Sequence, residues 1–390
     1  MKKFFAAAAL SLAALLLFAG CSAQVTVDIS SGWLTSPTTN YDQNFYESLD
    51  YSVKFANSDT EEHLTIEIDP DNSSYNITTE ARSTYTLPDG SATYTSVYHL
   101  TATLKVSATY TYTAEGRDPL VFSFGGSEDA DPDTFEAEDA DTVVMEVWFT
   151  SPQSTVSGTE TPPPAFSPIR SVQTSKTHGA ATSVSGDTTV FVSMYDFSVE
   201  KIYDRACENV TLTYTDNFAD LTEEERAAGD YASKESTRFE KSTSVGDLQK
   251  RYTCVDNAQL FFLTRGLAMN TDTSHTLTVV SGIGNNYATI RISCSEPVNS
   301  RVTFTMIDSN GVADAYENEE IPVVQMSFTL ADSGSNVGEG TTVTYAQRAS
   351  EGTNTNRCLP LSIETPYGFS VGNYVYTLET ASYQRPAGQA

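Results

Sequence analysis

The chain of 390 residues is strongly acidic, with 51 Asp and Glu against 22 Lys and Arg and a formal net charge of −29. A surface of this charge repels polyanions, so nucleic acid is excluded as a partner. Tyr (21) and Phe (19) are frequent, and together with many Thr they favour strands over helices.

The first 20 residues have the layout of a secretory signal. Lys2-Lys3 precede an apolar run over residues 4–18, and the small pair Ala19-Gly20 stands directly before Cys21. The run is shorter than the roughly 20 apolar residues of a membrane-spanning helix. No stop-transfer charges follow it, so we expect the signal to be removed.

The residues around the cleavage point resemble the lipobox of bacterial lipoproteins. The resemblance implies that Cys21 becomes the new N-terminus and carries diacylglycerol on its thiol. Such a lipid would hold the chain at the cell membrane, facing outside the cytoplasm. The alternative is ordinary signal cleavage after Ala23.

Residues 21–45 are polar and are expected to tether a first β domain over residues 46–150. Strict alternation over residues 75–87 predicts a strand with one buried face. The turn Pro88-Asp89-Gly90 leads into a longer alternating run over residues 92–112. At about 3.3 Å per residue this run is too long for one ordinary strand, so it is expected to bend, bulge or change sheets. Half-polar alternation indicates antiparallel pairing.

An acidic segment of the first domain contains Asp129, Asp131 and Asp133 at the spacing of the first ligands of a calcium loop. Thr134 stands where such a loop needs a turn-forming Gly, and Ala140 where it needs a bidentate Glu. A solvated acidic loop is therefore the favoured interpretation, with a calcium site as the alternative. No other cofactor is predicted.

Residues 151–168 are rich in Ser, Thr and Pro and are interpreted as a semi-rigid linker, the alternative being a long loop inside one larger domain. A second β domain is expected over residues 169–390. Its alternating runs predict strands at 190–199, 210–214, 277–280, 287–294, 302–307, 323–330, 343–345 and 374–378.

One or two short helices are expected in the second domain. Thr222 and Glu225 form a capping box for a helix that ends at Gly229, and residues 247–252 are the candidate for a second. The predicted fold class is therefore all-β. It comprises two mostly antiparallel β-sandwich-like domains, immunoglobulin-like in architecture, with one or two short helices in the second.

Four cysteines follow the signal, namely Cys207, Cys254, Cys294 and Cys358. An even number in an exported chain favours disulfides. Pairing of Cys207 with Cys254 and of Cys294 with Cys358 is preferred because each pair closes a local loop, and nested pairing is nearly as well supported. Free buried thiols are the alternative. A zinc site is disfavoured, since no two cysteines have C-x-x-C-like spacing and no His adjoins them.

No catalytic residue is assigned, because the chain lacks the G-x-S-x-G, H-E-x-x-H and P-loop motifs. We therefore predict a membrane-anchored extracytoplasmic lipoprotein that is not an enzyme. It would act as a binding, adhesion or structural surface module toward an unidentified extracellular ligand or protein. One alternative is a solute-binding lipoprotein of a transporter, and the other is a carbohydrate-active hydrolase with two carboxylates in a cleft.

Overall fold

The computed structural model describes residues 41–58, 64–113, 120–124, 134–137, 140–185, 187–216, 239–248, 252–267, 274–280, 287–330, 340–347, 358–367 and 371–386. The predicted lipid-bearing Cys21, the calcium candidates Asp129, Asp131 and Asp133, and the predicted helix over residues 222–229 lie outside these ranges. Among the residues that the structure does describe, no helix is long and apolar enough to span a membrane.

The described chain is almost entirely β-structure, as the sequence predicted. The strands are β1 (Tyr46–Asn57), β2 (Leu64–Ile68), β3 (Ser74–Thr86), β4 (Thr93–Val106), β5 (Ala108–Tyr112), β6 (Leu120–Phe124), β7 (Thr134–Ala137), β8 (Asp141–Thr150), β9 (Pro168–Ser185), β10 (Asp187–Tyr203), β11 (Val210–Asp216), β12 (Phe239–Val245), β13 (Cys254–Asp256), β14 (Ser274–Val280), β15 (Tyr287–Cys294), β16 (Val298–Ile307), β17 (Ala313–Leu330), β18 (Thr341–Ala346), β19 (Pro360–Tyr367) and β20 (Gly372–Ser382). A 3-10 turn, η3 (Asn257–Gln259), and a short helix, α2 (Leu260–Thr264), lie between β13 and β14.

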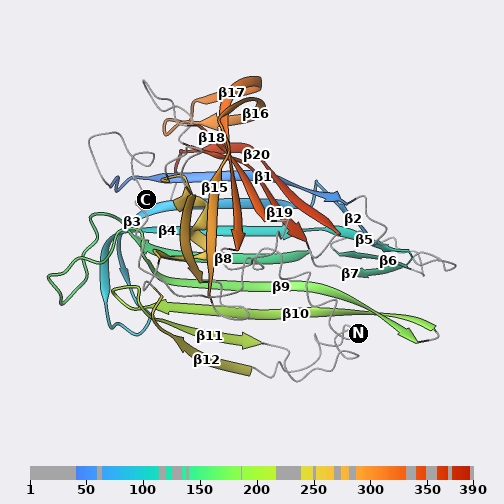
Figure 1. Cartoon of the computed structure of the whole chain (residues 1–390), viewed down its shortest axis with the longest axis horizontal. Helices are drawn as coiled ribbons and strands as arrows, with labels where there is room; N and C mark the ends of the chain where they lie inside the picture. Colours follow the sequence, from blue (N-terminus) through green and yellow to red (C-terminus); the bar gives the residue numbers. More distant parts are fainter. Residues whose placement is uncertain are drawn as a thin grey trace.

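Most strands belong to one large sheet. Its order is β12-β11-β10-β9-β8-β4-β3-β1-β20-β19-β18-β17-β15-β14-β13, and β16 pairs with both β17 and β20. Strands β2, β5, β6 and β7 form a second, small sheet. In Figure 1, β4, β8, β9 and β10 run across the view, while β15 and β19 cross them at a steep angle. The large sheet therefore folds over on itself into two layers whose strands cross.

The large sheet does not divide at the predicted linker. Strands β8 and β9, which end at Thr150 and begin at Pro168, pair antiparallel with each other, and β1 pairs with β20 near the chain's other end. The segment between β8 and β9 is bound to β4, because the backbone N–H of Thr95 donates to the Thr155 carbonyl (3.0 Å). The structure thus differs from the predicted pair of joined domains. A Ser/Thr/Pro-rich composition marks irregular backbone, and it does not distinguish a linker from a loop that packs on a strand.

The long alternating run changes sheets, which confirms the prediction made from its length. Strand β4 ends at Val106 in the large sheet, and β5 begins at Ala108 in the small one. Between them, the buried Ser107 carbonyl accepts hydrogen bonds from the Asp69 backbone N–H (2.9 Å) and from the Ser73 hydroxyl (3.1 Å). Because these bonds replace ladder pairing at the junction, the chain can leave one sheet and enter the next.

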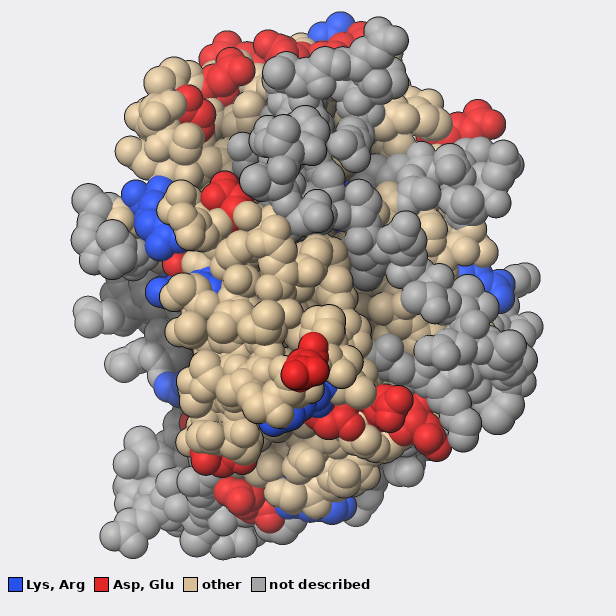
Figure 2. Space-filling view, turned by 90° about the vertical axis from the view of Figure 1, so that its left-hand side faces the viewer, with Lys and Arg blue, Asp and Glu red and all other residues tan. Residues whose placement is uncertain are grey.

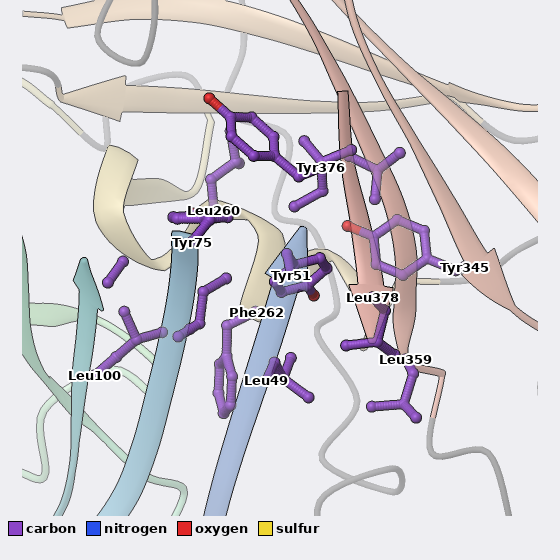
Figure 3. Close-up of a cluster of buried hydrophobic side chains, with 14 of the residues drawn as sticks. Leu49, Tyr51, Tyr75, Leu100, Leu260, Phe262, Tyr345, Leu359, Tyr376 and Leu378 are labelled. Atoms are coloured by element: carbon purple, nitrogen blue, oxygen red, sulfur yellow. The ribbon is translucent and has the colours of Figure 1, made fainter. Parts of the chain in front are cut away.

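The largest apolar cluster of the described residues includes side chains from both groups of crossing strands (Figure 3). Leu49 and Tyr51 of β1 belong to this cluster, together with Tyr376 of the paired strand β20 and with Leu260 and Phe262 of α2. The Phe262 ring meets that of Phe149 edge-on, with centroids 5.4 Å apart. Burial of a large apolar side chain contributes about 1.5–3 kcal/mol, so this short helix gains its stability from the core around it rather than from its length.

A helix forms at a place where the sequence predicted none. Asp247, Leu248 and Tyr252 of the helix predicted over residues 247–252 are not helical, residues 249–251 lie outside the described ranges, and α2 forms at residues 260–264. The observed helix is the apolar run Leu-Phe-Phe-Leu-Thr, which has no helical periodicity to reveal it. Burial on several sides, rather than an amphipathic pattern, selects this segment.

Candidate functional site

A buried polar cluster lies where β13 meets β9 and β10, a contact that we call the seam. Strand β13 ends the path of the large sheet and pairs along its length with β14. Toward β9 and β10 the contact is made by side chains. Asp256 of β13 accepts a hydrogen bond from Ser171 of β9 and another from Tyr203 of β10, both 2.6 Å long. Side chains rather than a backbone ladder thus join the two parts of the folded sheet here.

Lys201 of β10 lies at the centre of the seam. Its Nζ is 2.8 Å from Asp256 Oδ2, and the Lys201 and Asp256 side chains are 1% and 0% exposed. The same nitrogen donates to Asn257 Oδ1 (2.7 Å) and to the Val280 carbonyl (3.2 Å). An ammonium that is removed from water needs such partners, because its desolvation is costly.

Local structure explains how the sequence brings these groups together. Strand alternation places Val199, Lys201 and Tyr203 on one buried face of β10. Asp256 is the N-cap of η3, and its Oδ1 accepts a hydrogen bond from the backbone N–H of Ala258 (2.9 Å). Asp is favoured at this position because it satisfies an N–H at the start of a helical turn. Oδ2 is left to face the seam.

Sequence reasoning did not single out Lys201 or Asp256. The one available signal was the alternation of the strand predicted at residues 190–199. Continued past residue 199, this alternation places Lys201 on the inward side. A charged residue at an inward position is unusual unless it is paired. The alternation does not identify Asp256 as the partner, because Asp256 lies more than 50 positions further along the chain.

Electrostatics at the seam follow from burial. Desolvation lowers the pKa of Lys201, and the neighbouring Asp256 charge offsets part of that effect. Desolvation, together with the charge of Asp256, raises the pKa of Tyr203 well above its usual value. Tyr203 therefore stays a hydrogen-bond donor at neutral pH, and Lys201 is a better proton donor to its neighbours than an exposed lysine.

A second buried ion pair holds the other end of the helical segment. Arg265, directly after α2, donates to both carboxylate oxygens of Glu47 in β1, at 2.5 and 2.9 Å. Their side chains are 1% and 2% exposed. Burial alone would lower the pKa of Arg265, but the Glu47 charge and hydrogen bonds outweigh it and the pKa is raised. The segment from Asp256 to Arg265 is thus fixed by an ion pair at each end.

The four cysteines are free thiols in the structure, so the disulfides favoured by the sequence are not present in it. Cys207 and Cys254, the preferred local pair, do lie together beside the seam, in a small cluster with Tyr203 and Val280. The hydrogen bond between their side chains, followed by burial, raises the pKa of Cys254. That thiol is therefore held protonated, which makes it a poor nucleophile toward an oxidant. Cys294 and Cys358 both lie near Tyr345.

The outer face of the sheet carries a packed aromatic group around Trp148 of β8. The His99 and Tyr85 rings stack on the Trp148 ring, with centroids 4.4 and 4.8 Å away. The Arg170 guanidinium carbon lies 5.2 Å from the Trp148 ring centroid. Because three neighbours occupy the ring, Trp148 acts as part of the packing of this face rather than as an open platform for a sugar.

The described ranges contain no group of three or more His, Cys, Asp or Glu residues that could hold a metal ion. The calcium alternative stays a prediction, because its residues Asp129, Asp131 and Asp133 lie outside those ranges.

Comparison with known proteins gives a fold likeness at most. No family model matches the chain, and no curated protein does. Among solved structures the chain is similar to a beta-barrel-like protein of the domain of unknown function DUF1849 from Brucella abortus. The TM-score is 0.35 at 6% identity, over 86% of this chain and 97% of that one. The strands and the seam of the described chain themselves define its class, an all-β protein with a large folded-over sheet and a buried polar seam.

Proposed function

We propose that this chain is a membrane-anchored, extracytoplasmic lipoprotein that acts as a non-catalytic binding or structural surface module. The observation that carries the proposal is Cys21, which follows Ala19-Gly20 at the end of the apolar run over residues 4–18. Two acyl chains on one cysteine give stable attachment where a single chain is marginal. A lipidated Cys21 would therefore need no second anchor.

The folded body supports a role carried out by its outer surface. Its interior is occupied by aromatic and aliphatic side chains and by α2 (Figure 3). The all-β body and its crossing strands (Figure 1) support a β-sandwich-like surface module. On the face shown in Figure 2, acidic side chains gather toward the top and the bottom, and a broad uncharged area lies between them. An extracellular protein or ligand would meet a surface of this kind.

The two alternatives have less support. A solute-binding lipoprotein of the α/β kind alternates strands with helices, whereas η3 and α2 are the helical segments of the described chain. A hydrolase needs a pair of carboxylates facing a substrate. The buried carboxylates Glu47 and Asp256 instead face the cations Arg265 and Lys201.

The anchor is tested by replacing Cys21. Cells that express the full chain with Cys21→Ala are fed an alkyne-labelled fatty acid and then fractionated. The unmodified chain is expected in the membrane fraction with the label, and the variant is expected in the soluble extracytoplasmic fraction or the medium without it. Cys207→Ala serves as the matched control and should stay labelled and membrane-bound. A Cys21→Ala chain that remains in the membrane fraction would contradict the proposal.

A further inference from the structure

The seam contains the three groups that amide exchange between side chains requires: an amine, a carboxamide and a carboxyl group that can move protons. Lys201 Nζ contacts the Asn257 amide oxygen at 2.7 Å and the Asp256 carboxylate at 2.8 Å. The amide nitrogen of Asn257 has the weak acceptor Met145 Sδ at 3.8 Å as its partner. The nitrogen that would have to leave is therefore only loosely held.

We propose that the seam forms an intramolecular isopeptide bond between Lys201 Nζ and Asn257 Cγ, with Asp256 as the catalytic residue that transfers protons. Lys201 first gives a proton to Asp256, and the neutral amine attacks Cγ. The Cγ–Nδ2 bond breaks as Asp256 returns a proton to Nδ2, ammonia leaves, and Asp256 takes the remaining proton from the new amide nitrogen. One ammonium, one carboxylate and one primary amide thus become a secondary amide, ammonia and a carboxylic acid.

Burial favours the first step. In a site buried from solvent, proton transfer from Lys201 to Asp256 replaces two charges by two neutral groups, and the desolvation penalty of the charges is relieved. The lowered pKa of Lys201 acts in the same direction. The hydroxyls of Ser171 and Tyr203, each 2.6 Å from Asp256 Oδ2, keep the carboxyl group in place. Fixed reactants within contact distance convert the encounter into a unimolecular step.

The location gives the bond a structural consequence. Lys201 lies near the end of β10, and Asn257 begins η3, so the bond would join the two sides of the seam covalently. Side-chain contacts, which can separate, would be supplemented by a bond that survives unfolding. This inference does not depend on the lipid anchor, since the reaction uses groups of the folded body alone.

The first test is the intact mass of the purified full chain. We expect the chain to be one ammonia molecule lighter than the mass calculated for its N-terminally processed form. Lys201→Met and Asn257→Ala, processed in the same way, should each show the full calculated mass. Asp256→Asn keeps the size of the side chain but removes the proton acceptor, and it should also show the full mass, with far-ultraviolet circular dichroism to confirm folding.

Peptide mapping locates the missing ammonia. Trypsin cleaves after Lys and Arg, so an unmodified chain gives separate peptides 177–201 and 252–265. A bonded Lys201 resists cleavage, and residues 177–205 should appear joined to residues 252–265. This linked peptide does not require any variant to fold.

A matched control addresses a second source of ammonia loss. Asn310-Gly311 lies in an exposed turn, where a side-chain amide can lose ammonia by closing a ring with the following backbone. Asn310→Ala should therefore leave both the lighter mass and the linked peptide unchanged. The proposal is overturned by a full intact mass in the unmodified chain, or by ordinary cleavage after Lys201 with no linked peptide.

Discussion

The two buried ion pairs at the ends of the helical segment differ in what their cations can do. Arg265 meets Glu47 through two bonds, and its pKa is raised. Lys201 meets Asp256 through one contact, has the Asn257 amide beside it, and its pKa is lowered. A guanidinium keeps its proton in proteins, whereas a buried amine can release it. The Arg265 pair can therefore only hold the helix, while the Lys201 pair can also react.

The largest loss of stability is expected from breaking the Arg265–Glu47 pair, because the arginine cannot become neutral by giving its proton to the glutamate. Glu47→Ala leaves the Arg265 guanidinium buried without its carboxylate and should lower the free energy of unfolding by about 3–5 kcal/mol. Urea unfolding followed by tryptophan fluorescence measures the loss. Glu319→Ala, at an exposed position of β17, is the control and should change stability by less than about 0.5 kcal/mol. A loss under about 1 kcal/mol for Glu47→Ala would show that the pair does not anchor the helix.

A smaller loss is expected at the seam, because Asp256 has several donors. Tyr203→Phe removes one of them and should cost about 1–2 kcal/mol in the same measurement. Ser171 and Ala258 continue to donate to the carboxyl group. A loss as large as that of Glu47→Ala would contradict the view that the seam shares its hydrogen bonds among many partners.

The pH dependence separates the two cations. In the Asn257→Ala background, where no isopeptide bond can form, Lys201 titrates. Its folded pKa lies below its unfolded value, so between the two values the unfolded chain binds more protons and stability rises with pH. The stability difference between Asn257→Ala and Asn257→Ala/Lys201→Met should therefore shift in favour of the lysine as pH rises toward about 10.4, the usual lysine pKa.

Replacement of Arg265 provides the contrast in that experiment. The folded Arg265 pKa is raised, so this residue stays charged throughout the range. The stability difference that Arg265→Met makes should be flat over the same pH interval in urea unfolding. A slope for the arginine, or none for the lysine, would remove the distinction between the pairs.

The smallest effect is expected on the outer face. Arg170 pairs with Glu200 at 2.6 Å, but the two side chains are 20% and 33% exposed. Solvent screens such a pair, so Arg170→Ala should cost about 0.5–1 kcal/mol, including its contact with the Trp148 ring. The loss should shrink in high salt, which is not expected for the buried pairs.

Strand alternation predicted much of the fold but failed at β9. The hairpin of β3 and β4 was expected from residues 75–112, and its turn is confirmed by the positive φ of Gly90 (72°). No strand was predicted over residues 168–185, because β9 buries polar side chains. Ser171, Gln173 and Ser175 are 1–2% exposed, so the inward face of β9 has no hydrophobic pattern. This unpredicted strand lines the seam.

The sequence by itself determined the features that depend on near neighbours: the signal pattern that ends at Cys21, the β character of the body, and the need for a break in the alternating run over residues 92–112. Tertiary structure alone decided that both halves share one sheet, that residues 260–264 form a buried helix, and that Lys201 meets Asp256 and Asn257. The physical reason is range. Alternation and turn chemistry act over a few residues, whereas the seam is selected by burial and charge pairing between segments far apart in the chain.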